Sequence, residues 1–270
     1  MERQRVVSRE YKVMLRPTLF TGAEKSLLAD AHALWRDVAR RIGKVVVDVS
    51  GDLSRIKARR LITFLDTRRH RLDDAHYIFR ERRETDSPRR EVTLKFRHPD
   101  RFLAQARDMK PRTSGDTKTK FEEDIKGPFV SLHSFSTTVA VADAATFARL
   151  GDVLELFPDL VDRISGADKD EPLRAVNNFT AREVVVDGAL AQMGKTPKVD
   201  AEWALIVWYD ERRSSEKPVA VELSYRYGDK SEDYSGGVTR RASEVFDVIQ
   251  SGLKRWVDQK PRTKTAVAFQ

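Results

Sequence analysis

Hydrophobic and polar residues alternate with a period of two along several segments of the chain. In residues 90–98 the apolar residues Val92, Leu94 and Phe96 share one parity, and charged or hydroxyl residues hold the other. Successive side chains of a strand point to opposite faces, so this pattern predicts a strand with one apolar and one charged face. The same reasoning predicts further strands over residues 6–15, 44–50, 60–67, 76–84, 120–127, 178–187, 202–210 and 218–227.

Three other segments repeat their apolar residues at intervals of three and four, which is typical of amphipathic helices. They cover residues 21–43, 143–158 and 239–257. Residues 105–119 are polar with Pro and Gly and predict a loop, and the tail 259–270 predicts a frayed end. The sequence therefore predicts one α+β domain over residues 1–270, in which about eight antiparallel strands close into a β-barrel (tunnel) with flanking helices.

Charge changes this picture more than length does. Charged residues make up 34% of the chain, and 50 Lys and Arg outnumber 42 Asp and Glu, which makes a polyanionic partner plausible. The chain has no cysteine, which excludes disulfides and thiolate chemistry. No apolar run is long enough for a signal peptide or a membrane span, so we expect a soluble, cytoplasmic protein with no membrane partner.

The polar faces of the predicted strands carry both signs of charge. The basic members are Lys12, Arg80, Arg82, Lys95, Arg97, Lys120 and Arg182. The acidic members are Glu10, Glu91, Glu122, Asp124 and Glu222. These faces can be the solvated exterior of an ordinary barrel, with ion pairs between strands. Alternatively, the apolar faces pack outward under the helices and the charged faces line a wet tunnel.

The second arrangement points to a phosphate ligand. Clustered Arg and Lys suit phosphate oxygens, and Arg can bind them through two parallel hydrogen bonds. Carboxylates among those cations would repel a polyphosphate unless a divalent cation lay between them. No P-loop pattern is present, and the five His residues show no metal-pair spacing, so other phosphate and metal sites are not indicated.

The order of these motifs resembles that of the CYTH superfamily, the triphosphate tunnel metalloenzymes. The likeness extends from about residue 8 to 227 and combines short motifs that are each weak alone. They are Glu10-Tyr-Lys12, the Asp66-Thr67 strand end, Arg80-x-Arg82, Thr-Leu-Lys95-Phe-Arg97, Glu122-x-Asp124 and Glu222.

This resemblance implies that basic side chains of the tunnel grip a triphosphate. The substrate-binding residues would be Arg80, Arg82, Lys95, Arg97, Lys120 and Arg182. Mg²⁺ or Mn²⁺ would be held by Glu10, Glu122, Asp124 and Glu222, and Glu10 and Lys12 would act in catalysis. The family's activities include hydrolysis of inorganic, organic or nucleoside triphosphates, removal of the RNA 5′-triphosphate, and cyclisation of ATP.

Two positions depart from the family pattern. Ser8 and Ser224 stand where further acidic residues are expected, and their loss would weaken or remove a metal site. Metal-dependent hydrolysis of a small triphosphate is the leading hypothesis. A non-catalytic polyphosphate or nucleotide binder, an adenylyl cyclase and, last, a basic RNA-binding barrel remain as alternatives. The sequence does not indicate an oligomeric state.

Overall fold

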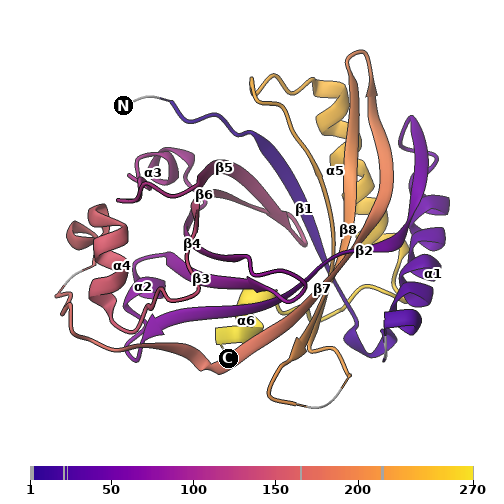
Figure 1. Cartoon of the computed structure of the whole chain (residues 1–270). Coiled ribbons are helices and arrows are strands. Elements are labelled where there is room, and N and C mark those ends of the chain that lie inside the picture. Colours follow the sequence, from indigo (N-terminus) through magenta and orange to yellow (C-terminus); the bar gives the residue numbers. More distant parts are fainter. Residues whose placement is uncertain (1–2, 21, 23, 165, 214–215, 270) are drawn as a thin grey trace.

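The computed structural model describes residues 3–269, apart from residues 21, 23, 165 and 214–215. Within these residues nine strands close into a barrel in the order β1-β5-β6-β4-β3-β2-β7-β8-β9 (Figure 1). Neighbouring strands are antiparallel except β1 and β5, which run parallel. The strands are β1 Ser8–Leu15, β2 Asp48–Thr67, β3 Tyr77–Glu84, β4 Arg90–His98, β5 Thr117–Lys126, β6 Val130–Ala140, β7 Leu173–Lys195, β8 Lys198–Asp210 and β9 Ala220–Tyr227.

Helices cover the outside of this sheet in two groups. Figure 1 shows α1 and α5 against the long strands on one side, and α2, α3 and α4 on the opposite side. The sixth helix, α6, lies apart from both groups and contacts β7 and β9. The helices are α1 Glu24–Ile42, α2 Arg71–Asp74, α3 Arg101–Gln105, α4 Leu150–Leu156, α5 Gly236–Gly252 and α6 Lys264–Phe269, with short 3-10 turns at Pro17–Leu19 and Pro158–Asp162.

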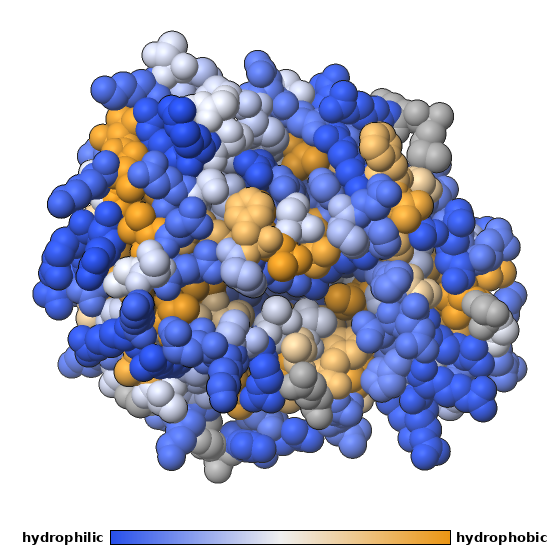
Figure 2. Space-filling model, turned by 180° about the vertical axis from the view of Figure 1, so that it is seen from behind, coloured by the Kyte–Doolittle hydropathy of each residue, from blue (hydrophilic) through white to orange (hydrophobic). Residues whose placement is uncertain are grey.

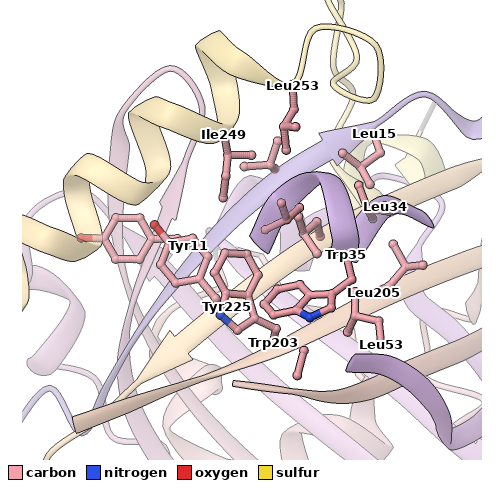
Figure 3. Close-up of a cluster of buried hydrophobic side chains, with 14 of the residues drawn as sticks. Tyr11, Leu15, Leu34, Trp35, Leu53, Trp203, Leu205, Tyr225, Ile249 and Leu253 are labelled. Atoms are coloured by element: carbon pink, nitrogen blue, oxygen red, sulfur yellow. The ribbon is translucent and has the colours of Figure 1, made fainter. Parts of the chain in front are cut away.

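The largest apolar cluster lies between the sheet and the pair of helices α1 and α5. Trp203 of β8 stacks on Tyr225 of β9 with ring centroids 4.5 Å apart, and Trp35 of α1 meets Trp203 edge-on at 5.2 Å (Figure 3). The hydroxyl of Tyr225 donates a hydrogen bond to the carbonyl of Ala242 in α5. Because these side chains come from the apolar parity of their strands, the apolar face of the sheet points outward, toward the helices.

A second cluster covers the outward face of β3, β4, β5 and β6 under the shorter helices. Phe79 and Leu94 of β3 and β4 are fully buried there against Leu150 and Val153 of α4. Asp66, at the end of β2, accepts hydrogen bonds from the backbone N–H groups of Thr67, Leu72 and Asp73, and so caps α2. Asp66 therefore shapes the turn between β2 and α2 and caps the helix.

The predicted closed sheet with flanking helices is confirmed, with differences in detail. The barrel has nine strands instead of about eight because β6, which is rich in Ser and Thr, was not predicted. Of the predicted strand 44–50 only residues 48–50 are in a strand, and they belong with 60–67 to one long strand, β2. Helix α4 begins only at Leu150, and the tail predicted to fray contains α6. The expectation of one domain over residues 1–270 stays a prediction.

The surface agrees with the high content of charged residues. On the face seen in Figure 2, polar side chains predominate and the apolar ones form separate small groups. None of the helices in the described part of the chain has the length and apolar character that crossing a membrane requires.

Candidate polyanion site on the inner face of the barrel

The opposite parity of the strands points toward the barrel axis and forms what we call the inner face. On β1, Glu10 lies opposite Arg226 of β9 and beside Asp124 of β5, and Lys12 lies opposite Ser224. Since directly opposed residues point to the same side of a sheet, the register assigns every inner-face residue. The charged and hydroxyl members that concern the site include Ser8, Glu10, Lys12, Arg60, Arg80, Arg82, Glu84, Glu91, Lys95, Arg97, Lys120, Glu122, Asp124, Lys126, Glu183, Glu222, Ser224 and Arg226.

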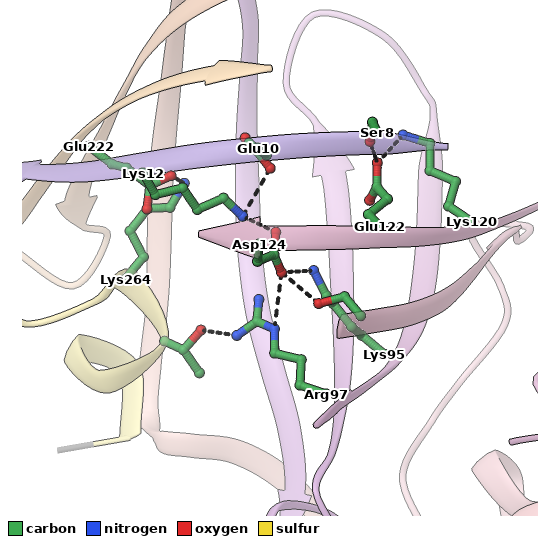
Figure 4. A network of polar contacts seen from close by, with 12 residues as sticks. Ser8, Glu10, Lys12, Lys95, Arg97, Lys120, Glu122, Asp124, Glu222 and Lys264 are labelled. Atoms are coloured by element: carbon green, nitrogen blue, oxygen red, sulfur yellow. Dashed lines mark hydrogen bonds and ion pairs between the residues drawn. The ribbon is translucent and has the colours of Figure 1, made fainter. Parts of the chain in front are cut away.

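Asp124 is the centre of the charged network (Figure 4). It is 1% exposed and accepts hydrogen bonds from Lys12 at 2.6 Å, Lys95 at 2.9 Å and the Ser134 hydroxyl at 2.6 Å. The guanidinium of Arg97 lies 3.6 Å from the same carboxylate. Burial acts to raise the pKa of Asp124, but these cations outweigh it and hold the pKa well below its usual range. Asp124 therefore stays ionised and fixes the positions of several cations.

Lys12 connects Asp124 to Glu10. Its ammonium lies 2.9 Å from Glu10 and 2.6 Å from Asp124. Burial acts to lower the pKa of Lys12, but the two carboxylates outweigh it, so the net shift is upward. Burial acts to raise the pKa of Glu10, and the charge of Lys12 reverses that shift. Both groups are therefore ionised at neutral pH.

Three arginines of the inner face have buried donors without a partner. The Nε atoms of Arg80, Arg82 and Arg97 are buried and make no hydrogen bond within the described residues. Arg82 keeps one long contact, 3.5 Å, to Glu91, whereas Arg80 makes no hydrogen bond or ion pair in the described part of the chain. Buried guanidinium donors without acceptors are costly. A bound anion would supply the acceptors that these atoms lack.

The pKa values of two cations reflect this crowding. Burial lowers the pKa of Arg80 to about 9, and the charges of Arg82 and Arg97 contribute in the same direction. Burial also lowers the pKa of Lys95 to about 8, with Asp124 opposing the shift. The positive charge on this side of the barrel is therefore only partly compensated by the carboxylates, and a bound anion would stabilise it.

The predicted site residues are placed as follows. Glu10, Lys12, Arg80, Arg82, Lys95, Arg97, Lys120, Glu122, Asp124 and Glu222 all belong to the inner face, but Arg182 does not. Arg182 lies on the outer face, 40% exposed, near Glu211 and over the ring of Tyr209. Its neighbour Glu183 points inward instead and accepts a hydrogen bond from the Trp208 indole at 2.8 Å. In this strand the residue that points to the inner face is therefore Glu183, one position after the predicted Arg182.

Sequence reasoning also missed several cations: by register Arg60, Lys126 and Arg226 belong to the inner face, and Lys264 approaches it from α6. Lys264, the first residue of α6, lies 3.1 Å from Glu222 (Figure 4). Its ammonium also lies over the ring of Trp208. Lys264 is 17% exposed although the tail was expected to fray. A six-residue segment is too short for a clear helical period, so no sequence signal indicated this placement.

The carboxylates do not converge in the way that a divalent metal ion requires. Glu122 bonds to Ser8 and Lys120, Glu222 to Lys264, and Glu10 and Asp124 share Lys12. In the described part of the chain no three acidic or histidine side chains gather in a metal-holding group. As arranged here, the predicted set Glu10, Glu122, Asp124 and Glu222 therefore does not fit Mg²⁺ or Mn²⁺.

An open hollow of about 800 Å³ lies next to the inner face, not within it. It is lined by residues around the starts of β1 and β5, including Arg5, Phe121 and Glu232, and it shares Lys120 with the inner face. Around Asp124 of β5 the side chains of the inner face contact one another: Lys12 reaches it from the neighbouring strand β1, and Lys95 reaches it from β4, across the intervening β6. A ligand bound there would replace some of these contacts between side chains with contacts to itself.

Comparison with known proteins adds distant structural likenesses. No family model matches the chain, and no curated protein matches it. A Hippeastrum protein provisionally assigned as an adenylyl cyclase, and described as having a dominant triphosphatase activity, is 13% identical. That match covers 96% of this chain and 93% of the other, with a TM-score of 0.44.

Two bacterial structures provisionally assigned as adenylate cyclases are similar at the same level. The one from Vibrio parahaemolyticus is 7% identical over 98% of both chains, with a TM-score of 0.37. The one from Bacillus halodurans is 9% identical over 98% of this chain and 96% of the other, with a TM-score of 0.38. At such scores the likeness is loose, and a function has to be derived from the inner face itself.

Proposed function

We propose that this protein binds the triphosphate group of a small compound on the inner face of the barrel and promotes its hydrolysis. The observation that carries the proposal is the group of partly buried arginines Arg80, Arg82 and Arg97, whose buried Nε atoms make no hydrogen bond within the described residues. A phosphate chain offers many acceptor oxygens and several negative charges, so it matches these donors in both number and sign. A single carboxylate ligand would satisfy only part of the group.

Further cations extend the site along the barrel. Lys95 and Lys12 flank Asp124, and Lys120 lies toward the start of β5, bonded to Glu122. Cations placed in advance around a phosphate chain stabilise the charge that develops on the leaving phosphate oxygens during cleavage. Because Lys12 remains protonated, it serves as a fixed charge, and the ionised Glu10 beside it can accept a hydrogen bond from the attacking water.

Binding without cleavage is the second candidate. It is favoured by Ser8 and Ser224, which stand in place of carboxylates, and by the pairing of every predicted metal ligand with a lysine or a serine hydroxyl. Such a protein would grip the same triphosphate but lack the means to activate water. Cyclisation of ATP requires the same grip and differs only in the attacking group. An RNA 5′-triphosphate is a further possible ligand of the same arginines.

One experiment separates these outcomes. Phosphate release from inorganic triphosphate is followed with Mg²⁺, with Mn²⁺ and with EDTA, and binding is measured in parallel by calorimetry. Release in any condition supports hydrolysis, and ATP as substrate then shows whether phosphate or a cyclic nucleotide is formed. Binding without release supports the second candidate. The absence of both release and binding would refute the proposed site.

A further inference from the structure

The C-terminal helix α6 is held within the barrel by apolar contacts. Phe269 packs against Phe64 of β2 at 5.8 Å, and Ala268 is buried in the cluster that contains Ile62 and Trp208. The side chain of Asn177 donates a hydrogen bond to the carbonyl of Ala268. Figure 1 shows α6 below the centre of the barrel, near the crossing of the long strands. These contacts fix the direction in which the first residues of α6 point.

Those first residues reach the charged network. The ammonium of Lys264 lies 3.1 Å from Glu222 and 5.6 Å from the centre of the Trp208 ring. Thr265 accepts a long hydrogen bond, 3.5 Å, from Arg97. The charge of Lys264 also lowers the pKa values of Glu183 and Glu10, in both cases against the effect of burial. A single ammonium therefore acts on carboxylates from three strands, β1, β7 and β9.

Lys264 lies beside Glu222, one of the predicted metal ligands. Glu222 is 4% exposed, and Lys264 is its ion-pair partner among the described residues. The pair lacks hydrogen-bond alignment, so the Glu222 Oε1 atom still has no donor. A divalent ion at Glu222 and Glu10 would meet the ammonium at close range and repel it. The lysine already supplies the positive charge that lies between carboxylates and phosphates in a metal-bound complex.

We propose that Lys264 is the resident cation of this carboxylate group, so that the inner face binds a triphosphate without a divalent metal ion. The inference rests on the proposed function, because it assumes that the ligand is a phosphate chain. The chain would lie between the arginine group and Lys264, with Lys12 and Lys264 separating its oxygens from Glu10 and Glu222. Lys264 is then a binding residue that the ligand requires.

The test is calorimetric titration with inorganic triphosphate, once in EDTA and once in excess Mg²⁺ at matched ionic strength. The wild-type protein is expected to bind in EDTA, with an affinity within about threefold of that in Mg²⁺. Lys264→Met is expected to weaken binding in EDTA at least tenfold, because a buried carboxylate then faces the phosphates unpaired. Lys264→Arg keeps the charge and is expected to restore most of the affinity.

The matched control is Lys260→Met, which removes an exposed lysine from the same tail and is expected to leave binding unchanged. Thermal unfolding of each variant shows whether α6 remains packed. Binding by the wild type only with Mg²⁺, or unaltered binding by a folded Lys264→Met, would overturn the role of Lys264 and leave the proposed function in place. If the wild type bound in neither buffer, both the role of Lys264 and the proposed function would be refuted.

Discussion

The two faces of the barrel follow opposite rules. On the outer face, apolar rings such as Trp203 and Tyr225 are fully buried under helices and satisfy one another by packing. On the inner face, Asp124 is fully buried and has several partners, whereas Arg80 is partly buried and its Nε atom makes no hydrogen bond among the described residues. An apolar interior contributes stability, whereas incompletely paired charges reduce it. The comparison shows that packing on the outer face stabilises the sheet, whereas the inner face leaves donors that the proposed ligand would pair.

The largest effect is expected from breaking the outer face. Trp203→Ala removes a ring that contacts both Trp35 and Tyr225 and leaves a cavity, so it is expected to lower the free energy of unfolding by about 3–5 kcal/mol. Urea denaturation measures this loss. Trp203→Phe is the control, because it keeps most of the apolar contact and is expected to be milder. Equal losses in both variants would contradict the packing role.

A substitution on the inner face is expected to have a smaller effect, and to lower ligand affinity instead of stability. Arg80→Met removes a partly buried charge whose Nε atom has no hydrogen bond among the described residues, so stability is expected to stay the same or rise. Triphosphate affinity is expected to fall at least tenfold, about 1.4 kcal/mol or more. Calorimetry and urea denaturation on the same preparation separate the two effects.

The matched control for this arginine lies on the same strand. Arg83 is half exposed, on the opposite parity of β3, and lies 3.6 Å from Glu81. Arg83→Met is expected to leave triphosphate affinity within about twofold. If both variants lost affinity equally, the arginines would act through overall charge, and the buried site would not be needed.

A weaker effect is expected from pH. Burial lowers the pKa of Lys95 to about 8, and a phosphate ligand requires its charged form. Affinity is therefore expected to fall as the pH rises through 8, by up to about tenfold between pH 7 and pH 9. Titrations at several pH values measure the slope. Lys95→Met is expected to bind more weakly at pH 7 and to lose most of this pH dependence. If its affinity changed with pH as steeply as that of the wild type, Lys95 would not be the group responsible.

Alternation alone predicted much of this arrangement. The parity of β1, β3, β4, β5 and β9 placed Glu10, Arg80, Lys95, Asp124 and Glu222 on one side of the sheet, and the structure brings them together. These strands could be read because each has one polar and one apolar face. The direction in which the charged face points could not be derived from alternation, since a solvated exterior gives the same pattern.

Three other elements, β6, β7 and α6, show no clear alternation or helical period in the sequence. In β7, Val184, Val185 and Val186 are consecutive and all buried, so apolar residues mark both faces and the register cannot be read. Strand β6 is short of apolar residues because its inward side chains are Ser and Thr that bond to other inner-face groups. Helix α6 depends on its contacts inside the barrel for its conformation. The missed features are those whose structure is set by tertiary contacts.

The smallest expected effects test the corrected register of β7 directly. Arg182 is exposed and rests on Tyr209, so Arg182→Met is expected to change triphosphate affinity less than about twofold and stability by less than about 1 kcal/mol. Glu183→Gln keeps an acceptor for the Trp208 indole but removes an inward negative charge, so it is expected to tighten binding a few-fold. Calorimetry on the two variants compares neighbours in sequence that differ in the face they occupy. A loss of affinity in Arg182→Met with no change in Glu183→Gln would place the arginine in the site and reverse the register. The expected result would instead show that one residue of register decides which side chain of this strand reaches the phosphates.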